Sequence, residues 1–115
     1  MTMENWQEQL RRGGLELAVL LTLTGPPRYG FEIIRRLEES TDLVVNEGTV
    51  YPLLARLARQ GLLATEWVSD EGPHPRKYYQ LTREGRERLE TMMRQWTIFV
   101  GKLDALARQA RGAVR

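Results

Sequence analysis

The sequence contains no cysteine and only one histidine among its 115 residues, and each scarcity excludes a class of chemistry. Without cysteine, the chain can form no disulfide, no zinc finger and no thiol nucleophile. With His74 alone, neither a histidine-based catalytic triad nor a histidine-rich metal site can be assembled. The nucleotide-binding patterns GxGxxG and GxxxxGK followed by Ser or Thr are also missing. We therefore expect no enzyme activity, no cofactor and no bound metal.

Long hydrophobic runs are missing as well. The most apolar stretch, residues 15–23, includes Glu16 and is too short to span a bilayer. The first ten residues are acidic and lack the hydrophobic segment of a signal peptide, so we expect a cytoplasmic protein without a membrane partner. A chain of 115 residues forms one domain, or one domain plus an oligomerisation element. Because the net charge is only +2, the placement of the charges matters more than their sum.

Three helices are predicted in the first half of the chain. Apolar side chains at helical spacing indicate a helix over residues 5–24, although Gly13-Gly14 could separate its first turns as an arm. The run Gly25-Pro26-Pro27 stops that helix. A second helix is expected over residues 29–39, followed by a loop over residues 40–48. No repeat or low-complexity tract interrupts this order of elements.

The third predicted helix follows this loop, with Thr49 and Asn46 as alternative N-caps. If Thr49 is the cap, Pro52 falls in the first turn, where its missing N–H costs no helix hydrogen bond. Apolar side chains form the inward stripe, while the opposite face has little bulk near its start. Such a face can lie deep in a DNA groove, where Tyr51 and Arg56 on its flanks reach phosphates or base edges. An ordinary amphipathic helix with a solvated face is the alternative.

A short hairpin is predicted after this helix, which Gly61 ends. Residues 63–69 and 76–81 alternate in polarity, and the side chains expected to point inward are Trp67, Tyr79 and Leu81. The tip between them, DEGPHPRK, ends in the basic pair Arg76 and Lys77. A basic hairpin directly after such a helix is typical of a winged helix-turn-helix, so we expect Arg76 or Lys77 to contact DNA phosphates. A solvated charged turn is the alternative.

A long last helix is predicted from Thr82, its N-cap. Its apolar residues recur at alternating intervals of three and four, the spacing of a coiled coil. The stripe is longer than a small helical core can cover, so we expect the same helix of a second subunit to cover it. Together with the N-terminal stripe, the predicted dimer interface comprises Trp6, Leu10, Leu89, Met92, Trp96, Phe99, Leu103 and Leu106.

The expected fold class is therefore mainly α with a small β-hairpin wing, a winged helix-turn-helix joined to a long C-terminal dimerisation helix. Residues 1–82 should form the DNA-binding domain with its N-terminal helix, and residues 83–115 the dimerisation helix. Two recognition helices related by a two-fold axis read an inverted repeat in double-stranded DNA, with half-sites about 34–36 Å apart.

Three blocks of the sequence, LAVLLTLTGPPRYGFEIIRRLEE, GTVYPLLARLARQGLL and PRKYYQLTREGRERLE, together resemble the PadR family of bacterial transcriptional regulators. They cover most of residues 15–90 in the family's order and spacing. The resemblance implies a dimeric winged-helix repressor of the short subfamily, with an operator similar to an ATGT…ACAT inverted repeat. Phe31 departs from the tyrosine that family members often have. The DNA-contacting positions that the resemblance implies are Tyr29, Thr49, Tyr51 and Lys77.

Trp96 lies near the middle of the long helix, at a core position of its heptads. In short family members, such a tryptophan can line a pore at the dimer interface and stack on flat aromatic compounds. The resemblance therefore implies a small hydrophobic or aromatic effector that releases the repressor and contacts Trp96, Met92, Phe99 and Leu17. The alternative is that Trp96 is only dimer core. Trp6 and Trp67 are expected to be packing residues.

Two other functions fit the same patterns. The hairpin and the third helix could bind a partner protein instead of DNA, or the chain could sense a ligand and act through such a partner. Clustering of Arg56, Arg59, Arg76 and Lys77 on one side favours DNA binding. Dispersed or salt-bridged charges there favour a protein partner.

Overall fold

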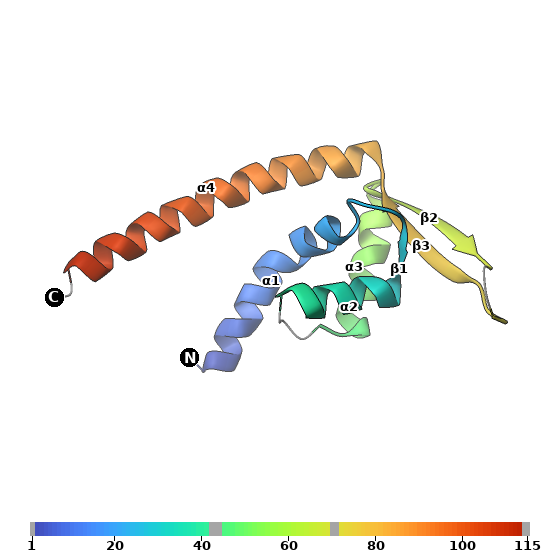
Figure 1. The fold of residues 1–115 in the computed structure, drawn as a ribbon, viewed down its shortest axis with the longest axis horizontal. Coiled ribbons are helices and arrows are strands. Elements are labelled where there is room, and N and C mark those ends of the chain that lie inside the picture. The colour runs from blue at the N-terminus through green and yellow to red at the C-terminus, as the bar shows by residue number, and fades with distance from the viewer. Residues whose placement is uncertain (1, 42–44, 70–71, 114–115) are drawn as a thin grey trace.

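The computed structural model describes residues 2–41, 45–69 and 72–113. Within them, the helices lie together and a small antiparallel sheet projects from one side of them (Figure 1). The elements are α1 (Met3–Thr22), β1 (Arg28–Tyr29), α2 (Gly30–Thr41), α3 (Glu47–Arg59), β2 (Leu63–Val68), β3 (Arg76–Leu81) and α4 (Arg83–Ala113). Helices α2 and α3 followed by the β2–β3 hairpin make a winged helix-turn-helix, to which α4 is attached, so the predicted fold class is confirmed.

Helix α1 is continuous through Gly13-Gly14, so the arm that these glycines could have separated does not form. Thr2 caps the helix by accepting a hydrogen bond from the Asn5 N–H at 3.2 Å, and Leu23 closes the other end. Because Thr2 supplies the N-cap, the helix begins at Met3, two residues before the predicted start at residue 5. It ends at Thr22, two residues before the predicted end at residue 24.

The strand β1 is an element that the sequence patterns do not predict, since two residues show no alternation. It pairs with β3 in the register Arg28↔Tyr79 and Tyr29↔Tyr78, and the strand order is β1-β3-β2. Tyr29 therefore belongs to the sheet, and α2 begins one residue later than predicted, at Gly30. The pairing fixes Tyr29 next to the hairpin, which we call the wing.

Asn46, not Thr49, is the N-cap of α3. Its side-chain oxygen accepts hydrogen bonds from the Thr49 N–H at 3.0 Å and from the Thr49 hydroxyl at 3.2 Å. Pro52 consequently lies inside the helix and not in the first turn, where a Thr49 cap would have placed it. Helix α3 therefore lacks the hydrogen bond to the Gly48 carbonyl. Gly61, with a φ of +79°, follows the end of the helix in the left-handed conformation, as predicted.

The hydrophobic core lies where α1, α2 and α3 meet the base of the wing and the start of α4. Gly85 permits the last of these contacts, because a Cβ at residue 85 would collide with the Leu62 carbonyl oxygen. Leu89 is the last buried side chain of α4 among the described residues. The largest fully buried side chains are Leu20, Leu23, Ile33, Leu37, Leu54, Leu57, Val19 and Val50.

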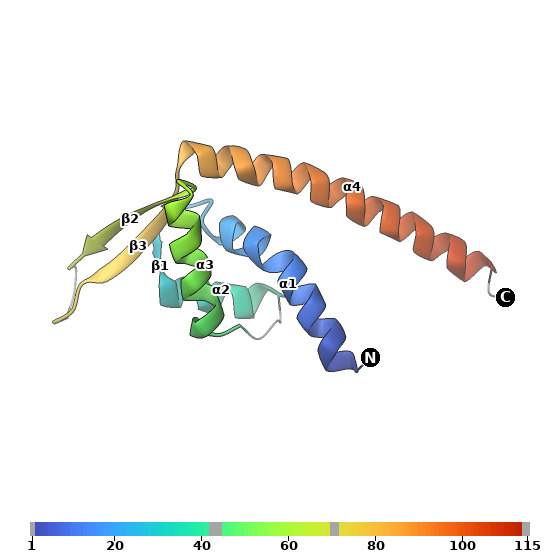
Figure 2. The same cartoon turned by 180° about the vertical axis from the view of Figure 1, so that it is seen from behind.

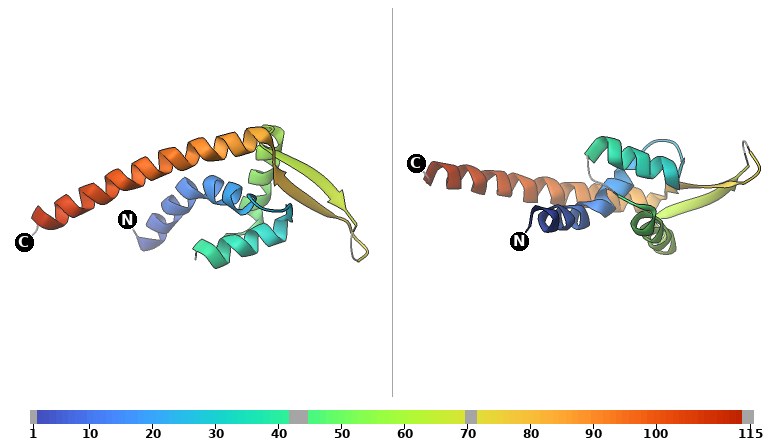
Figure 3. Two further views of the ribbon diagram at one scale, coloured as in Figure 1. Left: turned by 45° about the horizontal axis from the view of Figure 1, so that its top comes forward. Right: turned by 90° about the horizontal axis from the view of Figure 1, so that it is seen from below.

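Helix α4 begins at this core and then extends away from it (Figures 1 and 3). The Thr82 hydroxyl accepts a hydrogen bond from the Gly85 N–H at 3.0 Å, so Thr82 is the predicted N-cap. The helix has 31 residues and is about 46 Å long at a rise of about 1.5 Å per residue. It makes the molecule elongated, with extents of 63 × 31 × 20 Å. No helix in the described ranges is long and apolar enough to cross a membrane.

Candidate nucleic-acid interface

The outer face of α3 carries few large side chains, as the sequence indicates. It lies between the wing on one flank and α1 on the other (Figure 2). The opposite stripe of the helix is buried, so this face is fixed toward solvent. A face of this kind lets a helix approach the floor of the major groove. Its exposed residues are Gly48, Pro52, Ala55 and Arg59.

On the wing flank of α3, a depression of about 240 Å³ joins side chains from β1, α3 and both strands of the wing. We call it the wing-side pocket; it is lined by Tyr29, Gly30, Tyr51, Trp67, Arg76, Lys77 and Tyr79. Four of the six residues predicted to contact DNA therefore converge here, namely Tyr29, Tyr51, Arg76 and Lys77. The pairing of β1 with β3 brings them together. The alternation of side chains along the two strands could have predicted that Trp67 and Tyr79 lie beside Lys77. No signal in the sequence indicates that Gly30 lines the pocket.

The two basic side chains of the wing-side pocket lie against aromatic rings. The Arg76 guanidinium carbon is 4.6 Å from the centroid of the Tyr29 ring. The Lys77 Nζ atom is 5.8 Å from the ring centroids of both Trp67 and Tyr79. These distances are within the range of cation–π interactions. Because aromatic rings orient a cation without neutralising it, both positive charges are available to a phosphate.

Tyr51 reaches the wing-side pocket because residue 30 is glycine. A Cβ at Gly30 would lie 2.7 Å from the Cζ atom and the hydroxyl oxygen of Tyr51, so a larger residue would displace the ring. Burial, and then the Glu47 carboxylate, raise the pKa of the Tyr51 phenol. Burial, and then the neighbouring Tyr51, raise the pKa of Tyr79. Both phenols therefore stay protonated at neutral pH and can donate hydrogen bonds.

Trp67 is exposed, which corrects the prediction that it packs inward. Its position in the strand agrees with the predicted alternation, since it lies opposite Lys77 on the face that carries the buried Leu63 and Leu81. The core ends before this part of the wing, and Trp67 keeps 65% of its surface exposed. Its side chain consequently lines the wing-side pocket and not the core.

On the other flank of α3, a depression of about 420 Å³ lies between α3 and α1. We call it the α1-side depression; it is lined by Arg12, Leu15, Glu16, Thr49, Pro52, Leu53, Arg56 and Arg59. It holds the other two residues predicted to contact DNA, Thr49 and Arg56. Arg56 donates a hydrogen bond to Glu16 at 3.0 Å, and Arg12 donates one to Glu8 at 3.2 Å. The predicted basic cluster is thus divided between two flanks, and on this flank Arg56 is ion-paired.

Two of the four residues predicted to bind an effector, Leu17 and Trp96, line one groove of about 370 Å³. Met92 and Phe99 do not line this groove in the single chain, and Met93 contributes to it instead. The lining is almost entirely apolar and comes from α1, α2, α4 and the segment before α3. It consists of Leu10, Gly14, Leu15, Leu17, Ala18, Leu21, Leu37, Thr41, Val45, Met93 and Trp96.

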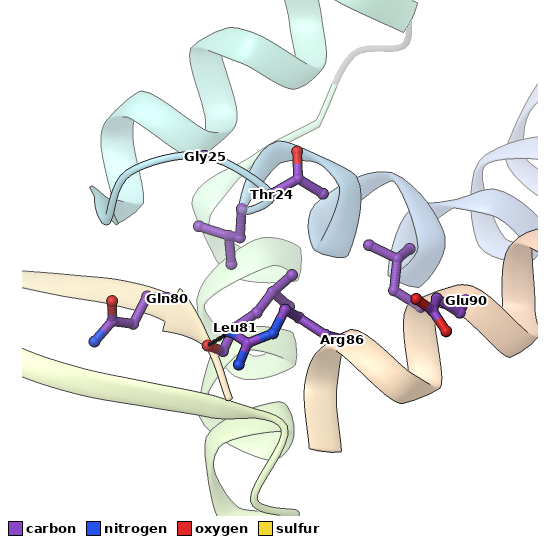
Figure 4. Close-up of a pocket in the computed structure, with 8 residues that line it drawn as sticks. Thr24, Gly25, Gln80, Leu81, Arg86 and Glu90 are labelled. Carbon is purple, nitrogen blue, oxygen red and sulfur yellow. Dashed lines mark hydrogen bonds between the residues drawn. The ribbon is translucent and has the colours of Figure 1, made fainter. Parts of the chain in front are cut away.

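A further depression of about 240 Å³ lies where the end of α1 meets β3 and the start of α4 (Figure 4). Arg86 extends into it and donates a hydrogen bond to the Leu81 carbonyl at 3.3 Å. Gln80 and Glu90 lie on either side of this pair in Figure 4. The bond joins α4 to β3, so we assign Arg86 a structural role.

The residues predicted to form a dimer interface fall into two groups in the single chain. Leu89 belongs to the hydrophobic core, and Met92 packs against it, so both have little surface left for a partner. The others lie on α1 and on the part of α4 beyond the core. Each keeps 41–60% of its surface exposed: Trp6, Leu10, Trp96, Phe99, Leu103 and Leu106. Exposed apolar surfaces of this extent are typical of sites that bind another molecule.

Comparison with known proteins agrees with this architecture. The model of the transcriptional regulator PadR-like family matches residues 19–91. The solved structure of a PadR-like transcription factor of Bacteroides fragilis is 42% identical, covering 89% of this chain and 98% of its own, with a TM-score of 0.72. A PadR family regulator of Eggerthella lenta is 37% identical over 90% of both chains, with a TM-score of 0.80. A protein of Lysinibacillus sphaericus is 30% identical over 89 residues, which are 74% of this chain and 80% of that one.

Proposed function

Because the chain belongs to the PadR-like family of transcriptional regulators, we propose that it is a homodimeric repressor that binds an inverted-repeat operator. Members of this family bind DNA and are regulators, not enzymes. One observation carries the proposal: Tyr29, Tyr51, Arg76 and Lys77 surround the wing-side pocket beside the open face of α3. A backbone phosphate in this pocket would meet phenol donors and cations while α3 occupies the neighbouring major groove.

Operator binding is tested by titrating the purified protein with DNA from upstream of the protein's own gene, at several salt concentrations. Scrambled DNA of the same length is the control. We expect tight binding to the upstream DNA alone, with an affinity that falls steeply as the salt concentration rises. A duplex with an ATGT…ACAT inverted repeat provides a second probe. Weak and equal binding to every duplex would contradict a repressor at these sites.

The exposed stripe of α1 and α4 supports the homodimer. A second subunit would cover this apolar surface and place two α3 helices about 34–36 Å apart, the spacing of adjacent half-sites. Leu103→Glu puts a charge on the stripe far from the wing, so it should yield monomers in sedimentation and weaken operator binding. Lys102→Glu, at the neighbouring exposed position, is the matched control and should leave the dimer intact. Monomeric wild-type protein at micromolar concentration would contradict the homodimer.

The apolar groove supports release of the repressor by a small hydrophobic or flat aromatic effector that contacts Trp96 and Leu17. A planar compound matches the indole of Trp96, which can stack on it. Trp96→Ala should therefore change the effector response, the dimer, or both. Unchanged assembly and an unchanged response of operator binding to aromatic compounds would remove Trp96 from the proposal.

The ion pair between Arg56 and Glu16 favours a second candidate function, in which the winged helix binds a protein or signals to one on sensing a ligand. A surface that alternates paired charges with apolar side chains suits a protein partner better than a polyanion. The same titration separates the two functions. A protein-binding module would bind upstream and scrambled DNA weakly, equally and only at low salt.

A further inference from the structure

We propose that Trp67 is a DNA-contacting residue whose indole packs on the deoxyribose of the nucleotide that carries the phosphate bound by Lys77. The inference rests on the proposed function and adds a contact that neither the sequence motifs nor the family match assigns. With this contact, the wing would bind the DNA backbone through apolar packing as well as through charge.

The register of the wing places Trp67 and Lys77 together. They are directly opposite each other in the β2–β3 pair, and the Lys77 Nζ atom is 5.8 Å from the centroid of the indole. They share the face of the wing that is buried at Leu63 and Leu81. This face is turned toward the body of the domain, and Trp67 and Lys77 form its continuation beyond the core. They therefore border the space between the wing and α3, where Tyr51 lies on the opposite side.

The exposure of Trp67 argues against a role in packing. A tryptophan that stabilises a domain buries most of its large apolar surface, whereas Trp67 keeps 65% exposed on an edge strand of the sheet. Exposing that surface to water is unfavourable unless another molecule covers it. Within the chain, the cation of Lys77 and the other lining residues of the wing-side pocket are its neighbours.

The chemistry of the wing-side pocket identifies the molecule that covers the indole. Along a DNA strand, charged phosphates alternate with sugars that present C–H groups. A cation beside a flat apolar ring matches one phosphate and its adjoining deoxyribose, and the indole N–H can donate to a phosphate oxygen. The Tyr51 hydroxyl can donate from the side of α3. The wing-side pocket is thus suited to one nucleotide of the backbone flanking the half-site.

The test compares Trp67→Ala and Trp67→Phe with the unaltered protein on the same operator duplex, at several salt concentrations. We expect Trp67→Ala to weaken binding about tenfold and Trp67→Phe to lose less, because a smaller ring keeps part of the contact. The salt dependence should not change, because Trp67 neutralises no phosphate, whereas Lys77→Ala should lower its slope by about one. Gln80→Ala, on the opposite face of β3, is the control and should bind as the unaltered chain does.

A second readout is the fluorescence of the protein on addition of DNA. Quenching that occurs in the unaltered chain and is lost in Trp67→Phe supports a direct contact. If Trp67→Ala binds the operator as tightly as the unaltered chain, the inference is wrong while the proposed function stands. If its affinity and its salt slope both fall, Trp67 only positions Lys77, and the direct contact is overturned. If the unaltered chain binds no operator, the proposed function fails and the inference fails with it.

Discussion

The two flanks of helix α3 hold their positive charges in different ways. On the wing flank, Arg76 and Lys77 lie against the rings of Tyr29, Trp67 and Tyr79. On the α1 flank, Arg56 and Arg12 are bound by the carboxylates of Glu16 and Glu8. An aromatic ring leaves a cation its full charge, whereas a carboxylate neutralises it and must be displaced before a phosphate can bind.

This difference suggests that the two flanks of α3 contribute unequally to DNA binding. The wing flank presents oriented cations and protonated phenols, so a backbone phosphate can bind there without breaking an existing ion pair. Binding of a phosphate by Arg56 on the α1 flank requires exchange of one ion pair for another, which yields little net free energy at an exposed site. We therefore expect the wing flank to provide most of the affinity for DNA, and the α1 flank to limit binding to unrelated sequences.

The largest effect is expected from closing the wing-side pocket at residue 30. Gly30→Ala places a Cβ within 2.7 Å of the Tyr51 Cζ atom, so the ring must move away from the wing or α3 must shift. We expect operator binding to weaken by about 3 kcal/mol and the protein to be less stable, as overpacked sites are. A DNA titration and a thermal melt measure both changes. Gly14→Ala, where no atom lies within 4 Å of the added Cβ, is the control. Full operator affinity in Gly30→Ala would show that the position of Tyr51 is unimportant.

Removal of single contacts on the wing flank should have the next largest effects. Tyr51→Ala and Lys77→Ala should each weaken operator binding by about 1–3 kcal/mol, the usual loss for one good contact. Both side chains lie far from the exposed stripe of α4, so sedimentation should show unchanged assembly. Tyr51→Phe separates the hydroxyl from the ring, since it removes the donor and keeps the packing against Gly30. A variant that binds as tightly as the unaltered protein would exclude that residue from the interface.

On the α1 flank, removal of a carboxylate should strengthen DNA binding. Glu16→Gln releases Arg56 from its ion pair, and the free guanidinium can then bind a phosphate. We expect binding to scrambled DNA to improve by about 0.5 kcal/mol, with a salt slope steeper by about one. Glu87→Gln breaks the pair with Arg83 at the start of α4, beyond the C-terminal end of α3, and is the matched control. Unchanged or weaker binding by Glu16→Gln would mean that the pair holds Arg56 in its binding position.

The smallest effect is expected from pH. The pKa values of Tyr51 and Tyr79 are raised above 10.0, because burial favours the neutral phenols. Their contribution to the free energy of unfolding is thus fully present below about pH 10 and is lost only as the pH rises through the raised values. Operator affinity should stay constant between about pH 7 and pH 9. A decrease in that interval would indicate that a phenolate forms near Arg76 or Lys77.

Much of the fold could be predicted because its signals are local. Helical spacing, strand alternation and capping residues indicated each longer element, since each depends on neighbours within about four residues. The errors have local causes too. Asn46 and Thr49 compete for one cap through side chains of similar chemistry, and Pro52 falls in the first turn only if Thr49 is the cap. The strand β1 is too short to leave any pattern.

The sequence supplied candidate residues for the site, but neither the geometry of the site nor the places of Gly30 and Trp67 in it. The sequence by itself determined a winged helix with a long apolar-striped helix, because periodicity and capping are properties of the chain. The helix face and the basic wing tip indicated Tyr51 and Lys77 as candidates, and the family resemblance added Tyr29. Only the tertiary structure decided that these side chains surround one pocket, that Arg56 is paired with Glu16, and that Trp67 lies beyond the core. These facts depend on where β1 pairs and where the core ends, and both are set by packing between segments far apart in sequence.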